Sequence, residues 1–178
     1  MLLGRRPAGY PIWMQTSIQS SLFLSKEFAM KWYKEQFIIS DEKSWLDAEY
    51  IHDYLSNRSY WAAKIPLNTV IKSIEGSVCF GMYAGEKQIG FARVVTDKAT
   101  FGYLADVFID ENYRGNGLAK WLMEVIMAYP ELQGLRRWML GTRDAHGLYE
   151  KFGFEPLENP NRVMHIHNRD VYEMNKNG

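Results

Sequence analysis

Residues 113–119 read Tyr-Arg-Gly-Asn-Gly-Leu-Ala, and they lie between the apolar run at 104–109 and the helix-like run at 120–126. This order predicts a strand, a tight turn and a helix. The glycines at 115 and 117 allow backbone conformations that other residues disfavour, so several amide groups can point into one concavity. The N-terminus of the following helix adds the positive end of its dipole. The stretch therefore predicts a pyrophosphate site built from backbone groups.

Two other phosphate loops do not match these residues. A Walker loop requires Gly-x-x-x-x-Gly-Lys-Ser/Thr, which is absent, and a dinucleotide fingerprint requires a third glycine where this chain has Lys120. The plain alternative is a hairpin-like turn at Asn116 and Gly117.

A second stretch, Leu-Tyr-Glu-Lys-Phe-Gly-Phe at 148–154, follows Arg-x-x-Gly-x-Ala at 114–119. With a strand predicted before each, these two motifs in this order resemble the GCN5-related N-acetyltransferase (GNAT) superfamily, over roughly residues 31–178. The resemblance implies an α/β (α+β) fold with a mixed central sheet of six to seven strands and about four flanking helices. It also implies acetyl-CoA as cosubstrate, bound where two strands splay apart.

The resemblance assigns contacts with acetyl-CoA to three groups of residues. The backbone of Val107, Phe108 and Ile109 would pair with the pantetheine arm, and one of its amides would polarise the thioester carbonyl. The turn that would hold the pyrophosphate consists of Arg114, Gly115, Asn116, Gly117, Leu118 and Ala119. In the third group, Thr142 stands where the family commonly has asparagine. His146 lies on the same predicted helix face as Tyr149, where it could contact CoA or shuttle a proton.

Two residues are candidates for the chemistry of acetyl transfer. Tyr149 occupies the position at which many relatives have a tyrosine that protonates the departing thiolate; the alternative is a tyrosine packed against Phe152. Asp106 precedes the pantetheine segment, where a carboxylate can serve as general base directly or through water. It can equally be a structural hydrogen-bond acceptor.

Aromatic side chains suggest where the acetyl acceptor binds. Tyr60 and Trp61 lie between the first two predicted helices, a region that lines the acceptor site in the family, although packing on the sheet is the simpler interpretation. His165 and His167 share a face of a predicted strand. Two such ligands without a third do not indicate a metal site, so no metal is expected.

Composition narrows the class of protein. The 178 residues include 21 basic and 21 acidic side chains, so no excess of positive charge points to nucleic acid. Cys79 is the single cysteine and is expected to be a buried, inert thiol. Because the sequence contains neither eighteen consecutive apolar residues nor a secretory signal pattern, we expect a cytoplasmic protein without a membrane partner.

Two segments divide the chain. Residues 31–178 form the expected acetyltransferase domain. Residues 1–30 are an extension that either precedes a natural translation start at Met30 or forms an amphipathic arm.

Periodicity and turn residues predict the remaining elements. Strands are expected at 33–40, 77–84, 87–96, 101–109, 137–140, 154–155 and 163–174. Helices are expected at 46–55, with Ser44 as cap, and at 67–74, 118–129 and 145–152, the last ended by Gly153; residues 57–66 are expected to be a loop.

These features together predict an acetyl-CoA-dependent N-acetyltransferase that acts by direct transfer in a ternary complex. The expected acceptor is a primary amine on a small molecule, and the main rival is a peptide N-terminus or lysine. A non-catalytic acyl-CoA sensor is the alternative class, and a homodimer is compatible with both.

Overall fold

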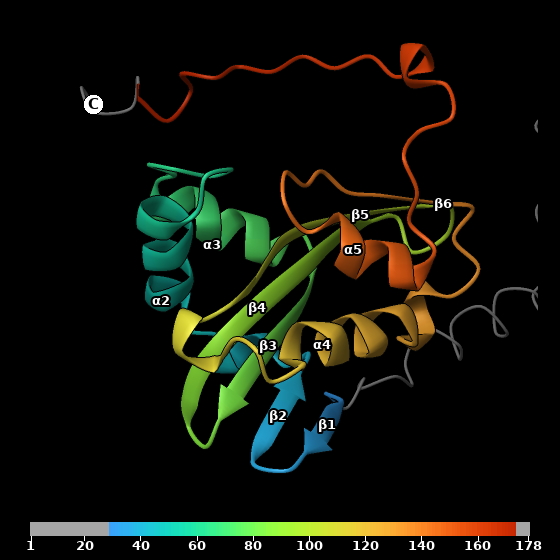
Figure 1. Ribbon diagram of the computed structural model, residues 1–178. Coiled ribbons are helices and arrows are strands. Elements are labelled where there is room, and N and C mark those ends of the chain that lie inside the picture. The colour runs from blue at the N-terminus through green and yellow to red at the C-terminus, as the bar shows by residue number, and fades with distance from the viewer. Residues whose placement is uncertain (1–28, 174–178) are drawn as a thin grey trace, which may run out of the picture.

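A single mixed sheet organises the protein, and helices cover both of its faces (Figure 1). The computed structural model describes residues 29–173. Within these residues, six strands lie side by side in chain order: β1 Lys31–Lys34, β2 Phe37–Ser40, β3 Val78–Ala84, β4 Lys87–Thr96, β5 Phe101–Ile109 and β6 Arg137–Met139. The first five are antiparallel, and β6 runs parallel to β5. The predicted mixed sheet is confirmed.

Two helices pack on each face. On one face lie α2 Ala48–Asp53 and α3 Leu67–Glu75; on the other lie α4 Leu118–Met127 and α5 His146–Tyr149 (Figure 1). Side chains of a strand alternate between faces. Within β5, for example, Phe108 therefore joins the core under α2 and α3, whereas Ile109 joins the core under α4.

Local signals located the central elements well. The strand predicted at 101–109 has those bounds, and β3 and β4 meet in the predicted hairpin, where Gly85 has a φ of 61°. The helix predicted to reach residue 129 ends at Met127. The last predicted helix is α5 followed by a 3₁₀ turn, Glu150–Phe152, and it ends at Gly153 as expected.

The strand predicted at 33–40 is two strands. β1 and β2 form a hairpin whose register pairs Lys34 with Phe37, and Glu35 takes the positive φ of 54°. The turn contains no glycine, asparagine or proline at Glu35 and Gln36, so its sequence carried no turn signal.

The first helix begins later than predicted. Ser44 lies in a 3₁₀ turn, Lys43–Trp45, and the cap of α2 is Asp47, whose Oδ1 accepts from the Tyr50 amide at 2.9 Å. A π-helical turn, Tyr54–Arg58, then extends α2 into the segment predicted as loop.

The strands predicted at 154–155 and 163–174 are wrong within the described residues. The chain after α5 contains Pro156 and a 3₁₀ turn, Pro160–Arg162, and then passes above α2 and α3 (Figure 1). Met164 and Ile166 are 95% and 102% exposed, so the apolar residues of the alternating pattern do not form a buried face. Apart from Ala29 and Met30, the N-terminal extension lies outside the described residues. None of the helices in residues 29–173 combines the length and apolarity that a membrane span needs.

Candidate functional site

The turn between β5 and α4 presents free backbone amides. Gly115 and Gly117 have φ angles of 82° and 71°, and Gly117 is the N-cap of α4. The first helical bond is donated by the Trp121 amide to the Gly117 carbonyl at 3.0 Å. Within the described part of the chain, the six amides of residues 115–120 donate to no other group. Unpaired amides at a helix N-terminus are suited to binding an anion.

The polar side chains of this turn brace it. The Arg114 guanidinium donates from Nε to the Ile109 carbonyl at 3.1 Å and from Nη2 to the Tyr54 hydroxyl at 2.6 Å. Asn116 Nδ2 donates to the Tyr113 carbonyl at 3.1 Å. Both side chains bond to the protein itself, so it is the backbone that remains available to a ligand.

A β-bulge lies just before this turn. Phe91 of β4 pairs with Phe108, and Arg93 pairs with Ala105, so Asp106 and Val107 both stand opposite one residue of β4. Asp106 takes a φ of 53° in the bulge.

Beyond the bulge, the sheet opens. β6 pairs with β5 only at residues 101–103, and among the described residues no strand lies beside 104–109 on that side. The segment predicted to meet pantetheine therefore has no strand along one edge, although the Ile109 carbonyl accepts from Arg114 Nε. The side chain of Phe108 stacks on Tyr54 with ring centroids 3.7 Å apart.

Asp106 is held by two partners. Its Oδ2 lies 2.5 Å from Arg93 Nε, and its Oδ1 accepts from the indole N–H of Trp61 at 3.0 Å. Only 8% of the Asp106 side chain is exposed. A carboxylate removed from water at such a place is stabilised by the opposite charge and by the hydrogen bond.

A cavity of about 280 Å³ gathers several of the predicted residues. Trp61 and Tyr60 form part of its wall, Asp106 and Val107 come from β5, and Thr142 and Tyr149 come from the segment around α5. Its other members include Arg93, Tyr103, Asp144 and Tyr172.

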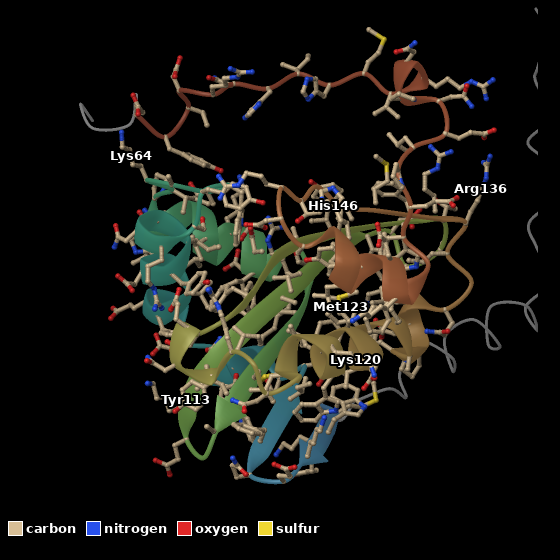
Figure 2. The ribbon with its side chains drawn as sticks, viewed as in Figure 1. Lys64, Tyr113, Lys120, Met123, Arg136 and His146 are labelled. Carbon is tan, nitrogen blue, oxygen red and sulfur yellow. The ribbon has the colours of Figure 1, made fainter. Side chains whose placement is uncertain are left out.

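Tyr149 stands between this cavity and a second one. The second cavity, also of about 280 Å³, is lined by Thr142, His146 and Tyr149 among others. Thr142 Oγ1 accepts from the Ala145 amide at 3.1 Å, and the exposed His146 lies at the first position of α5 (Figure 2). The predicted residues Thr142, His146 and Tyr149 are thus brought together.

The Tyr149 phenol is neutral over the physiological range. Burial, followed by the charges of Tyr60 and Asp144, raises the pKa of Tyr149 to about 12. The side chain is 8% exposed and packs edge-on against Phe154, with ring centroids 5.9 Å apart. Its hydroxyl makes no hydrogen bond to another described residue, so its proton is available to a ligand.

Cys79 lies in the core under α2 and α3 and is absent from the lining of the Tyr149 cavities. Burial raises the pKa of its thiol to about 11. Such a thiol is protonated and unreactive at neutral pH. Among the described residues, no three His, Cys, Asp or Glu side chains gather in a way that could hold a metal ion.

Arg93, Tyr103 and Tyr172 are among the contributors to the cavity that the sequence analysis did not predict. Arg93 carried a signal, a single charge within the apolar stretch of β4, which indicates a paired or functional side chain. Tyr103 and Tyr172 carried none, because the first sits on an ordinary strand and the second comes from the segment mistaken for a strand.

Comparisons with known proteins agree on one family. Residues 75–156 match the family model described as the acetyltransferase (GNAT) domain. A protein of Gibberella zeae, provisionally named an acetyltransferase, is 30% identical over 142 residues, covering 67% of this chain and 79% of that protein. The crystal structure of a Xanthomonas campestris protein, provisionally assigned to the GNAT acetyltransferases, has a TM-score of 0.76 at 44% identity, covering 79% of this chain and 99% of that one.

A more distant structure contains the cosubstrate. A GNAT acetyltransferase of Elizabethkingia anophelis with acetyl-CoA bound shares the fold, with a TM-score of 0.54 at 13% identity, and covers 70% of this chain and 80% of that one.

Proposed function

Because the chain belongs to the GNAT acetyltransferase family, we propose that it transfers the acetyl group of acetyl-CoA to the primary amine of a small molecule, directly and within a ternary complex. The observation that carries this proposal is that three features occur together: the free amides at 115–120, the edge of β5 that no strand covers, and the neutral Tyr149 beside a cavity. Each part matches one requirement of the reaction.

The residues present fit acetyl-CoA. The amides of 115–120 and the dipole of α4 would hold the pyrophosphate, without a bound cation or a basic cluster. Residues 107–109 would pair through their backbone with the pantetheine arm, and an amide there would stabilise the oxyanion at the thioester carbonyl. Arg114 and Asn116 would keep the turn in shape.

Tyr149 would act as the general acid. The amine nitrogen forms a bond to the thioester carbon, the carbon–sulfur bond breaks, and the sulfur takes the phenolic proton. The proton that the amine loses returns to the phenolate through water, so the enzyme ends as it began. A phenol whose pKa is about 12 keeps its proton until this step.

Asp106 would serve as a positioning residue. Both of its oxygens already accept, one from Arg93 and one from Trp61. We therefore assign to Asp106 the structural role, fixing the bulge and the Trp61 ring, and assign removal of the amine proton to water.

Calorimetric titration with acetyl-CoA, combined with a thiol-release assay over a panel of amines, tests this function for the wild type and for Tyr149→Phe. We expect unchanged binding and a loss of turnover of about 100- to 10,000-fold in the variant. Binding without turnover of any amine would favour an acyl-CoA sensor. Absence of binding would refute the assignment.

A further inference from the structure

Five aromatic rings surround the cavity beside Tyr149. Tyr60, Trp61 and Tyr103 line it and are 43%, 42% and 39% exposed, values that are high for such large rings in a folded domain. Tyr149 and Tyr172 complete the aromatic lining. Among the residues that the structure describes, three of the six exposed aromatic rings therefore lie where the amine acceptor of the proposed reaction would enter.

Two of these rings are fixed in place. The Tyr60 hydroxyl accepts from the Arg143 amide at 2.8 Å, and the Arg143 guanidinium lies 3.8 Å from the centre of the Tyr60 ring. Trp61 packs edge-on against Tyr60, with centroids 5.0 Å apart, and its indole nitrogen is held by Asp106. A wall of fixed aromatic side chains binds a flat ring without first paying the entropy of ordering itself.

The charges at the cavity cancel. Asp106 is paired with Arg93, and Asp144 lies 3.8 Å from the Arg143 guanidinium. The carboxylates of the lining are therefore each matched by an arginine, and no excess of negative charge selects a polyamine or an aminoglycoside.

The size of the cavity limits the size of the acceptor. Its volume of about 280 Å³ is just below the roughly 300–1,000 Å³ found for small-molecule sites. That space suits one ring system with a short amine arm.

Resting on the proposed acetyl transfer, we infer that the acceptor is a small amine that carries an aromatic ring, of the arylalkylamine type. The ring lies among Tyr60, Trp61 and Tyr103, and the amine reaches the thioester beside Tyr149. Contacts between aromatic rings are favoured over aliphatic contacts of equal area. The cavity should therefore prefer aromatic amines to aliphatic amines of similar size.

The test compares kcat/KM for 2-phenylethylamine, tryptamine, 2-cyclohexylethylamine, spermidine and glucosamine, with acetyl-CoA saturating. We expect the two aromatic amines to exceed spermidine and glucosamine at least tenfold, and 2-phenylethylamine to exceed its cyclohexyl counterpart about three- to tenfold. Equal or greater values for the cyclohexyl amine, the polyamine or the aminosugar would overturn the inference.

Variants of the cavity rings test where the aromatic ring of the acceptor binds. Tyr103→Leu and Trp61→Leu should each lower kcat/KM for 2-phenylethylamine about threefold to tenfold, with acetyl-CoA binding unchanged by calorimetry. Phe101→Leu is the matched control, because Phe101 is a partly exposed ring on the same strand, two residues from Tyr103, and does not line the cavity. An equal effect in the control would contradict the placement of the ring.

Measurements of acetyl-CoA binding and of amine acetylation distinguish a wrong acceptor class from a wrong function. Acetyl-CoA binding without acetylation of either aromatic amine overturns the inference about the acceptor alone. Absence of acetyl-CoA binding overturns the proposed function itself.

Discussion

The indole N–H of Trp61 donates to Oδ1 of Asp106 at 3.0 Å, across 45 positions of sequence. The bond joins the loop after α2 to the bulge of β5, and the same carboxylate also pairs with Arg93. The Asp106 side chain therefore connects the bulge of β5, a ring of the cavity wall and a mostly buried arginine.

Replacing Asp106 by asparagine should damage stability more than chemistry. Asparagine tolerates a positive φ better than most residues and can still accept from Trp61, but Arg93 loses its counter-charge. We expect the free energy of unfolding in a denaturant titration to fall by about 1–3 kcal/mol, and kcat to fall less than tenfold. A double variant with Arg93→Met should recover part of the stability. A general base would instead lose about 100-fold or more in kcat at native stability.

Alanine at Gly117 should weaken acetyl-CoA binding through the backbone. An added methyl group would meet no atom within 4 Å, so the cost comes from the positive φ, about 1–2 kcal/mol, and from the displaced amides. We expect the Kd for acetyl-CoA, measured by calorimetry, to rise about tenfold. Gly134→Ala provides the control, because Gly134 has a φ of 74°, equally open surroundings and no place in the turn. That variant should lose stability without losing affinity.

The alkaline side of the pH profile should be independent of Tyr149. Because the pKa of this phenol is raised to about 12, it stays protonated throughout the usual assay range. The wild type should therefore show no fall in kcat/KM between pH 8 and about pH 10 that Tyr149→Phe lacks. A fall centred near 10 in the wild type alone would show that the phenol titrates at its ordinary pKa.

The same shift makes stability depend on pH. The folded state holds the Tyr149 proton more tightly than the unfolded state, whose tyrosine pKa is about 10. The resulting stabilisation is complete below about pH 10 and is lost as the pH rises toward about 12. Between pH 9 and pH 11, the free energy of unfolding should fall more for the wild type than for Tyr149→Phe. The other tyrosines are the same in both proteins, so their contributions cancel in this comparison.

Cys79 should be dispensable for turnover. Its raised pKa, about 11, leaves about a hundredth of the thiolate that an ordinary cysteine has at neutral pH, and the side chain is buried. Iodoacetamide should not alkylate the native protein at pH 8 by mass spectrometry, whereas the denatured protein should gain one adduct. Cys79→Ala should keep kcat within about twofold. A large loss of kcat in this variant would argue for a covalent acyl-enzyme.

The parts of the fold that could be predicted from sequence were those whose conformation is set by residues adjacent in the chain. The glycines at 85, 115, 117 and 153 mark backbone conformations that their own chemistry requires, and the elements beside them were found nearly in place. The hairpin at Glu35 was missed because a residue without turn preference adopts the strained angle there, and only the pairing of β1 with β2 compensates for it.

The candidate site divides in the same way. The turn, the open strand edge and Tyr149 were predicted from motifs contiguous in sequence. The pairing of Arg93 with Asp106 could not be predicted, because it depends on a register shift between β4 and β5 that brings the two side chains together. Tyr172 reaches the cavity because residues 163–171 do not form the strand that their alternating pattern predicted.

The short pairing of β5 with β6 has a thermodynamic consequence. If pantetheine lies along residues 107–109 as proposed, the cosubstrate takes the place of a missing strand, and the hydrogen bonds of the sheet are completed by a molecule that is not protein. Unfolding then requires its release, so acetyl-CoA at 100 times its Kd would add about 2.7 kcal/mol to the stability of the domain. On this view, the resistance of the protein to heat reports how much acetyl-CoA surrounds it.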